Sequence, residues 1–127
     1  MVKLPEELKK LFEEKKGPAF IATVDAEGKP NVCPKGSLNV LDNEHLWYTE
    51  SAGKKTYENI KKNPSVAVVV LEKRRGYQLK GKAELITEGP IFEAAVKRTK
   101  EFYRRLGVKF RKPIAAVRIK VEEIYSI

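Results

Sequence analysis

The sequence predicts a mainly β protein, an antiparallel barrel with a few flanking helices, folded as a single domain over residues 1–127. Seven stretches are short and rich in β-branched or aromatic residues, whereas only three have the apolar spacing of a helix. The connections in the first half have hairpin length, which favours an antiparallel barrel over a doubly wound sheet. A chain of 127 residues, 42% of them apolar, is long enough for one core and too short for two.

An amphipathic helix is expected first, over residues 5–14. Pro5 stands at its start and Gly17-Pro18 follows its end, as is typical of helix boundaries. The apolar residues at helical spacing are Leu4, Leu8, Leu11 and Phe12.

Two hairpins of β-formers are expected next. Their strands cover residues 19–24, 31–33, 37–41 and 46–49. A connection containing Gly28 joins the first pair, and the turn Asp42-Asn43-Glu44 joins the second.

The second half is expected to mix helices with longer strands. A short helix over residues 54–62, with Tyr57 and Ile60 facing inward, stops before Pro64, because the residue before a proline disfavours helical geometry. The later elements are strands at 66–71, 77–87 and 114–125 and a helix that begins at Pro90 and is capped by Gly107.

The net charge of +9 lies almost entirely in the second half of the chain. Residues 1–64 contain 11 basic and 10 acidic residues, and residues 65–127 contain 15 and 7. A basic barrel that binds nucleic acid is therefore one alternative, because Lys and Arg release counterions from phosphate backbones. The run Lys73-Arg74-Arg75 has only Tyr77 nearby for base stacking, so a solvated surface is the favoured interpretation.

Composition excludes several classes of protein. The longest apolar stretches have the length of strands, far below the roughly 20 residues of a membrane span. The charged first 16 residues lack the apolar core of a signal peptide, so we expect a cytoplasmic protein. Cys33 has no second cysteine to pair with, and His45 is the only histidine, so neither an internal disulfide nor a metal site is expected.

Segment 30–37, between two expected strands, concentrates groups that suit an anion. Pro34 withholds a backbone donor from the sheet, and Gly36 permits close approach of the backbone. Lys35 and Ser37 supply a cation and a hydroxyl. An irregular strand edge with a surface lysine gives the same pattern, so this segment alone does not decide between the two.

Segment 51–56 follows a strand and opens a helix. Free backbone N–H groups and the positive end of the helix dipole attract phosphate at such a place, and Lys54, Lys55 and Thr56 add charge and a hydroxyl. A nucleotide triphosphatase loop would need a glycine where this chain has Tyr48. An ordinary helix start with two solvated lysines is the alternative.

Taken in order and spacing, these segments resemble the pyridoxamine 5′-phosphate oxidase-like flavin-binding split-barrel superfamily, in particular its small stand-alone FMN-binding proteins. The stretches that carry the resemblance are 22–30, 32–37, 53–60 with Asn63-Pro64, and 76–81. They extend over most of the chain.

The resemblance implies a six-stranded antiparallel split barrel that forms a homodimer and binds flavin mononucleotide (FMN) at the subunit interface. Residues implied to line the ribityl chain and ring are Val32, Cys33, Pro34, Lys35, Gly36 and Ser37. Those implied at the phosphate are Lys54, Lys55 and Thr56, preceded by Gly53 in the same loop. Tyr77 and Gln78 are expected as contacts from the partner subunit. The expected function is a redox protein or small flavin-dependent oxidoreductase whose cofactor carries the chemistry.

Other branches of the superfamily define the alternatives. Related split barrels bind a deazaflavin, which stays an alternative cofactor. The chain has no C-terminal Arg-x-His-type signature of the vitamin-synthesising oxidases, so pyridoxamine phosphate oxidation is not expected. Its single histidine also argues against the heme-degrading branch.

Overall fold

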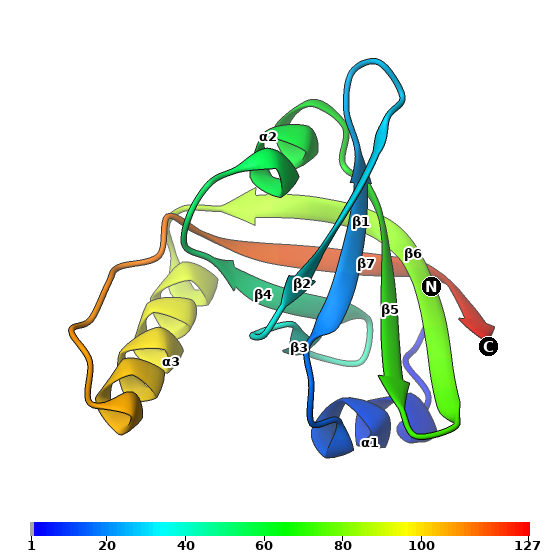
Figure 1. Ribbon diagram of the computed structural model, residues 1–127, viewed down its shortest axis with the longest axis horizontal. Coiled ribbons are helices and arrows are strands. Elements are labelled where there is room, and N and C mark those ends of the chain that lie inside the picture. The colour runs from blue at the N-terminus through cyan, green and yellow to red at the C-terminus, as the bar shows by residue number, and fades with distance from the viewer. Residues whose placement is uncertain (1) are drawn as a thin grey trace.

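A computed structural model describes residues 2–127 as a curled sheet with three helices (Figure 1). The strands are β1 (Ala19–Val24), β2 (Pro30–Lys35), β3 (Asn39–Val40), β4 (His45–Glu50), β5 (Ser65–Glu72), β6 (Arg75–Ile86) and β7 (Ala115–Ser126). The helices are α1 (Glu6–Glu14), α2 (Lys55–Lys62) and α3 (Pro90–Leu106). The sheet order is β2-β1-β5-β6-β7-β4-β3, and every pair in it is antiparallel.

The expected fold class, a mainly β antiparallel barrel with flanking helices, is confirmed. The sheet has seven strands where the resemblance implied six, and β3 contributes only two residues. β1 has the expected bounds, whereas β2 is six residues long instead of three. None of the helices in residues 2–127 is long and apolar enough to cross a bilayer.

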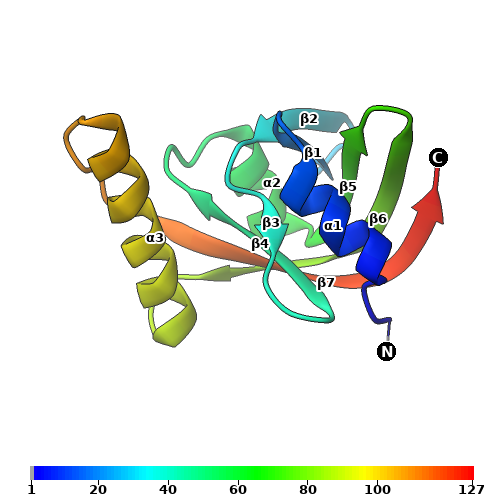
Figure 2. The ribbon, with the colours of Figure 1, turned by 90° about the horizontal axis from the view of Figure 1, so that it is seen from below.

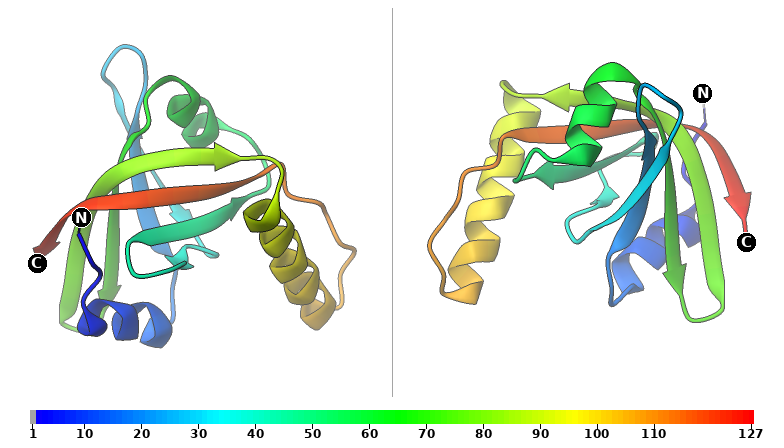
Figure 3. Two further views of the ribbon diagram at one scale, coloured as in Figure 1. Left: turned by 180° about the vertical axis from the view of Figure 1, so that it is seen from behind. Right: turned by 45° about the horizontal axis from the view of Figure 1, so that its top comes forward.

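The two longest strands, β6 and β7, carry the bend of the sheet. Both have 12 residues, and Figure 3 shows them running side by side along the barrel. Their register shifts between Lys80 and Gly81. At Gly81 a Cβ atom would lie 2.1 Å from the carbonyl oxygen of Lys120, so only glycine fits this β-bulge.

The main core fills the inside of the curled sheet, and α1 closes one end of it (Figure 2). Leu8 and Leu11 of α1 are fully buried, as the helical spacing predicts. The backbone N–H of Leu4 donates to the carbonyl of Asn43 at 2.7 Å, which ties the start of the chain to the turn before β4.

The other two helices cover different parts of the barrel. α2 buries Thr56, Asn59 and Ile60, and Tyr57, expected to face inward, is only half-buried. α3 stands at the side of the sheet (Figure 2) and buries only Phe92 and Ala95. Residues in the second half of α3 line a cavity between the helix and the barrel.

Candidate functional site

The fold brings the two segments singled out in the sequence into direct contact. Thr56, in the first turn of α2, is 5% exposed, and its hydroxyl accepts a hydrogen bond from the Asn31 amide of β2 at 3.1 Å. The Cys33 sulfur lies 3.1 Å from the same hydroxyl. The Thr56 side chain therefore fixes α2 against β2, and the start of the helix lies beside segment 30–37.

The first turn of α2 carries unpaired donors and positive charge. No side chain caps its N-terminus, and the first helical bond runs from the Glu58 N–H to the Lys54 carbonyl at 3.0 Å. Lys54 and Lys55 are both exposed. Backbone N–H groups, the helix dipole and two ammonium groups at one place favour an anion such as phosphate.

The loop before α2 has a fixed shape. The backbone N–H groups of Ala52 and Gly53 both donate to one carboxylate oxygen of Glu50, each at 3.4 Å. Gly53 has a φ of +65°, and a Cβ atom there would lie 2.7 Å from the Ile114 side chain. Position 53 therefore requires glycine, both for its positive φ and because a side chain would collide with Ile114.

Side chains alternate along β2, so segment 30–37 has two faces. Pro30, Val32 and Pro34 are exposed, whereas Asn31, Cys33 and Lys35 are half-buried. The Lys35 ammonium lies 3.1 Å from a Glu50 carboxylate oxygen and 5.2 Å from the centre of the Tyr48 ring. The charge of Lys35 is therefore neutralised inside the barrel, and a contact with a flavin ring stays a prediction for this residue.

Tyr48 places an unusual hydroxyl at the centre of this cluster. The residue is fully buried, and its hydroxyl has no hydrogen-bond partner among residues 2–127. Burial raises the pKa of the Tyr48 hydroxyl far above its ordinary value, and the nearby Glu50 carboxylate raises it further. The phenol therefore stays protonated over the whole working range of pH.

Removal of the Tyr48 hydroxyl is expected to leave the stability of the protein undiminished. In Tyr48→Phe the ring still fills its place and an unsatisfied buried group disappears, so the free energy of unfolding should stay unchanged or rise by up to about 1 kcal/mol. Urea unfolding of the ligand-free protein measures this. Tyr77→Phe, which removes a hydroxyl hydrogen-bonded to Glu7 at 3.3 Å, serves as the comparison. A loss above about 1 kcal/mol in Tyr48→Phe would mean that the hydroxyl has a partner.

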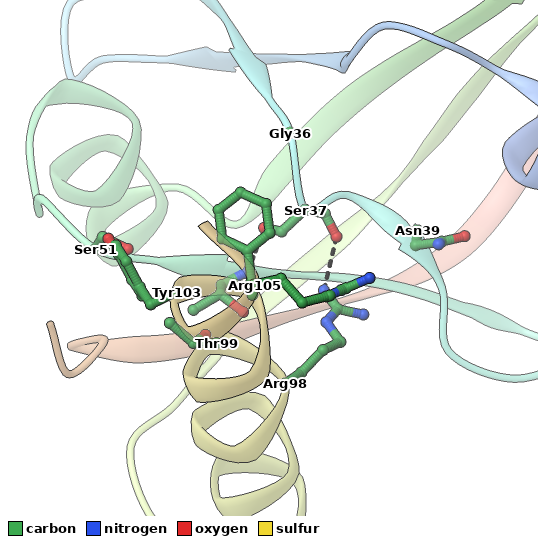
Figure 4. Close-up of a pocket in the computed structure, with 10 residues that line it drawn as sticks. Gly36, Ser37, Asn39, Ser51, Arg98, Thr99, Tyr103 and Arg105 are labelled. Carbon is green, nitrogen blue, oxygen red and sulfur yellow. Dashed lines mark hydrogen bonds between the residues drawn. The ribbon is translucent and has the colours of Figure 1, made fainter. Parts of the chain in front are cut away.

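A cavity of about 540 Å³ lies between α3 and the barrel, directly beside segment 30–37 (Figure 4). Its lining residues are Gly36, Ser37, Asn39, Thr49, Ser51, Arg98, Thr99, Phe102, Tyr103 and Arg105. Gly36 and Ser37 were predicted as site residues, Ser51 opens the segment 51–56 that the sequence singled out, and the rest were not predicted. The α3 residues were missed because their apolar neighbours at helical spacing indicated only packing.

Arg98 joins α3 to segment 30–37. Its guanidinium donates to the Ser37 carbonyl at 2.7 Å and stacks on the Trp47 ring with 4.3 Å to the ring centre (Figure 4 shows the hydrogen bond). No carboxylate among residues 2–127 forms an ion pair with it, and burial lowers the pKa of its guanidinium. The Ser37 hydroxyl in turn accepts the Thr49 N–H at 3.0 Å, whereas the buried Thr49 hydroxyl has no partner among residues 2–127.

Residues 4–127 match the family described as pyridoxamine 5′-phosphate oxidase. The chain belongs to this family. The suspected superfamily is thereby confirmed over nearly the whole sequence.

Several relatives are more than 30% identical in sequence to this chain. Protein MJ0282 of Methanocaldococcus jannaschii, which is uncharacterised, is 37% identical over 130 residues, covering 100% of this chain and 83% of its own. Group A Streptococcus HupZ is 32% identical with a TM-score of 0.85, covering 98% and 94% of the two chains. A putative pyridoxamine 5′-phosphate oxidase of Lactobacillus delbrueckii is also 32% identical, with a TM-score of 0.74 and coverage of 97% and 93%.

More distant members of the fold differ in what their names say they bind. An FMN-binding protein of Syntrophomonas wolfei is 18% identical with a TM-score of 0.77, and an F420 reductase is 22% identical with a TM-score of 0.70. The heme storage protein HutZ of Vibrio cholerae is 20% identical with a TM-score of 0.69. These three share the split-barrel fold of the pyridoxamine 5′-phosphate oxidase family with this chain.

Two predicted residues lie apart from the cluster within the chain. Tyr77 and Gln78 are on β6, opposite Val70 and Val69 of β5, and neither lines the cavity beside α3. The Tyr77 hydroxyl donates to Glu7 of α1 at 3.3 Å. Their predicted contribution from a partner subunit stays a prediction.

Proposed function

We propose that this member of the pyridoxamine 5′-phosphate oxidase family binds FMN, with its phosphate at the first turn of α2 and its ring beside segment 30–37. The observation that carries the proposal is the contact between Thr56 and Cys33, which joins the two segments into one site. Lys54 and Lys55 supply the charge that a phosphate needs. The Thr56 hydroxyl accepts from the Asn31 amide, which leaves its own O–H as a donor, and its backbone N–H lies in the first turn of α2.

The cavity beside α3 suits the ring end of the ligand. Its volume of about 540 Å³ is in the usual range for small-molecule sites, and it opens next to Gly36 and Ser37. Phe102 and Tyr103 offer aromatic surface, and Arg98 offers a cation without an acidic partner. When bound, FMN supplies the electron-transfer chemistry, and these residues orient it and limit the access of water.

A homodimer would complete the site. β2 is an edge strand of the sheet, and its outer face with β1 and β5 is apolar. Phe20 is 39% exposed, Val32 68% and Leu71 56%. A second copy packed on this face would bury these side chains and stand next to segment 30–37.

The decisive experiment is a visible spectrum of the purified protein, followed by mass spectrometry of what denaturation releases. FMN, with absorption near 450 nm and about one molecule per chain, is expected. Size-exclusion chromatography with light scattering is expected to give twice the mass of the chain. Release of a deazaflavin would support the phosphate site but identify a different cofactor. Release of heme or of nothing would contradict the proposal.

A further inference from the structure

Glu50 is a buried carboxylate at the end of β4 whose contacts join both halves of the candidate site. It is 3% exposed. One carboxylate oxygen is 3.1 Å from the Lys35 ammonium, and the other accepts the N–H groups of Ala52 and Gly53. The Glu50 carbonyl also accepts the Ile114 N–H at 2.9 Å, so its backbone is fixed as well.

The burial of the Glu50 carboxylate requires compensating contacts. Burying a charge is costly unless it is paired and hydrogen-bonded, and here every partner belongs to one of the two segments that form the site. The hydrogen bonds from Ala52 and Gly53 turn these N–H groups toward the barrel. They are therefore not free to bind a phosphate, and the loop that they hold leads directly into Lys54 and the first turn of α2.

Lys35 balances the charge of this carboxylate. A bare carboxylate near the start of α2 would repel a phosphate, but the ammonium at 3.1 Å neutralises it. The pair thus leaves the positive charge of Lys54 and Lys55 uncompensated toward solvent. Tyr48 packs beside the pair and excludes water from it.

We propose that Glu50 is a positioning residue that selects a phosphate-bearing flavin, and this rests on the proposed function. Glu50 fixes the loop 51–53 so that the first turn of α2 and Lys54 face the phosphate. The Lys35 ammonium neutralises the Glu50 carboxylate, which therefore does not repel the phosphate. The selectivity concerns the phosphate group only. Binding of the ring depends on segment 30–37, which Glu50 contacts only at Lys35, and on the cavity, which Glu50 does not line.

The test compares FMN with riboflavin, which has the same ring and no phosphate. In Glu50→Gln, the affinity for FMN measured by flavin fluorescence should fall at least tenfold more than the affinity for riboflavin, whose binding Glu50 reaches only through Lys35. Glu14→Gln is the matched control, because Glu14 lies on α1 at the opposite end of the barrel from α2 (Figure 1), is 55% exposed at the side chain and is ion-paired with Arg75. It should change neither affinity.

A second measurement needs no flavin. Amide hydrogen exchange of Ala52 and Gly53 in the ligand-free protein should become at least tenfold faster in Glu50→Gln and stay unchanged in Glu14→Gln. Glu50→Asp keeps the charge but is too short to reach the loop, so it should show the same acceleration. This variant keeps the test valid if Glu50→Gln does not fold.

The outcomes separate two failures. Equal losses of FMN and riboflavin affinity, or unchanged exchange at Ala52 and Gly53, would overturn the positioning role of Glu50 while leaving FMN binding intact. A wild-type protein that binds neither flavin would refute the proposed function together with the phosphate selectivity. In that case the exchange data would still show whether Glu50 holds the loop.

Discussion

Replacing Lys54 and Lys55 together by alanine is expected to lower the affinity for FMN about a hundredfold. Each ammonium contributes a charge-assisted hydrogen bond of about 1.5 kcal/mol, the low end of the range because both side chains are exposed. Two such bonds give about 3 kcal/mol, and 1.4 kcal/mol corresponds to a tenfold change in affinity. Fluorescence titration of the ligand-free double variant measures the loss, which should shrink at high salt as the charges are screened.

The control is Lys61→Ala with Lys62→Ala at the other end of the same helix. It removes the same charge from two exposed lysines and leaves the first turn intact. FMN affinity should fall less than threefold there, and riboflavin affinity should be unchanged in both double variants. An equal loss in the two variants would show that net charge, not a phosphate site at the first turn of α2, governs binding.

Strand positions could be predicted from the sequence wherever the pattern is local. β1 has the expected bounds because six consecutive apolar or β-branched residues stand between Gly17-Pro18 and the turn that contains Gly28. β2 was expected to end at Cys33, since proline withholds a hydrogen bond from a sheet. The structure continues β2 to Lys35, and Pro30 and Pro34 fit because β2 is an edge strand with a free side.

The candidate site was only partly predictable, because its parts meet through long-range contacts. Lys54 and Lys55 could be found from the loop and helix that carry them. The pairing of Thr56 with Cys33 and that of Lys35 with Glu50 depend on how α2 and β4 pack against β2. Glu50 follows the expected strand 46–49 in the sequence, and nothing there indicates that it is buried.

The contribution of α3 was hidden for a different reason. Its apolar residues predict packing along the whole helix, yet Phe102 and Leu106 are 53% and 57% exposed. The helix touches the barrel mainly through its first half, and the second half leaves the cavity open. Helical spacing identifies a face, but not whether a neighbouring element covers it.

The largest effect on stability is expected from Gly81→Ala, at the β-bulge between β6 and β7. The new methyl group would lie 2.1 Å from the Lys120 carbonyl oxygen and 2.9 Å from its carbon. Both atoms are backbone of a paired strand, so relief requires the two longest strands to separate locally. We expect the free energy of unfolding to fall by about 3 kcal/mol, the upper end of the range for overpacking.

Urea unfolding with an unchanged m-value measures this loss as a lower midpoint. Gly17→Ala is the control, because a Cβ atom there meets no atom within 4 Å and the φ is not positive. It should change stability by less than about 0.5 kcal/mol. If Gly81→Ala were as mild as Gly17→Ala, the close approach of β6 and β7 would not be needed for the bend. Because β7 pairs with β4, which carries Tyr48 and Glu50, loosening this bend should also weaken FMN binding.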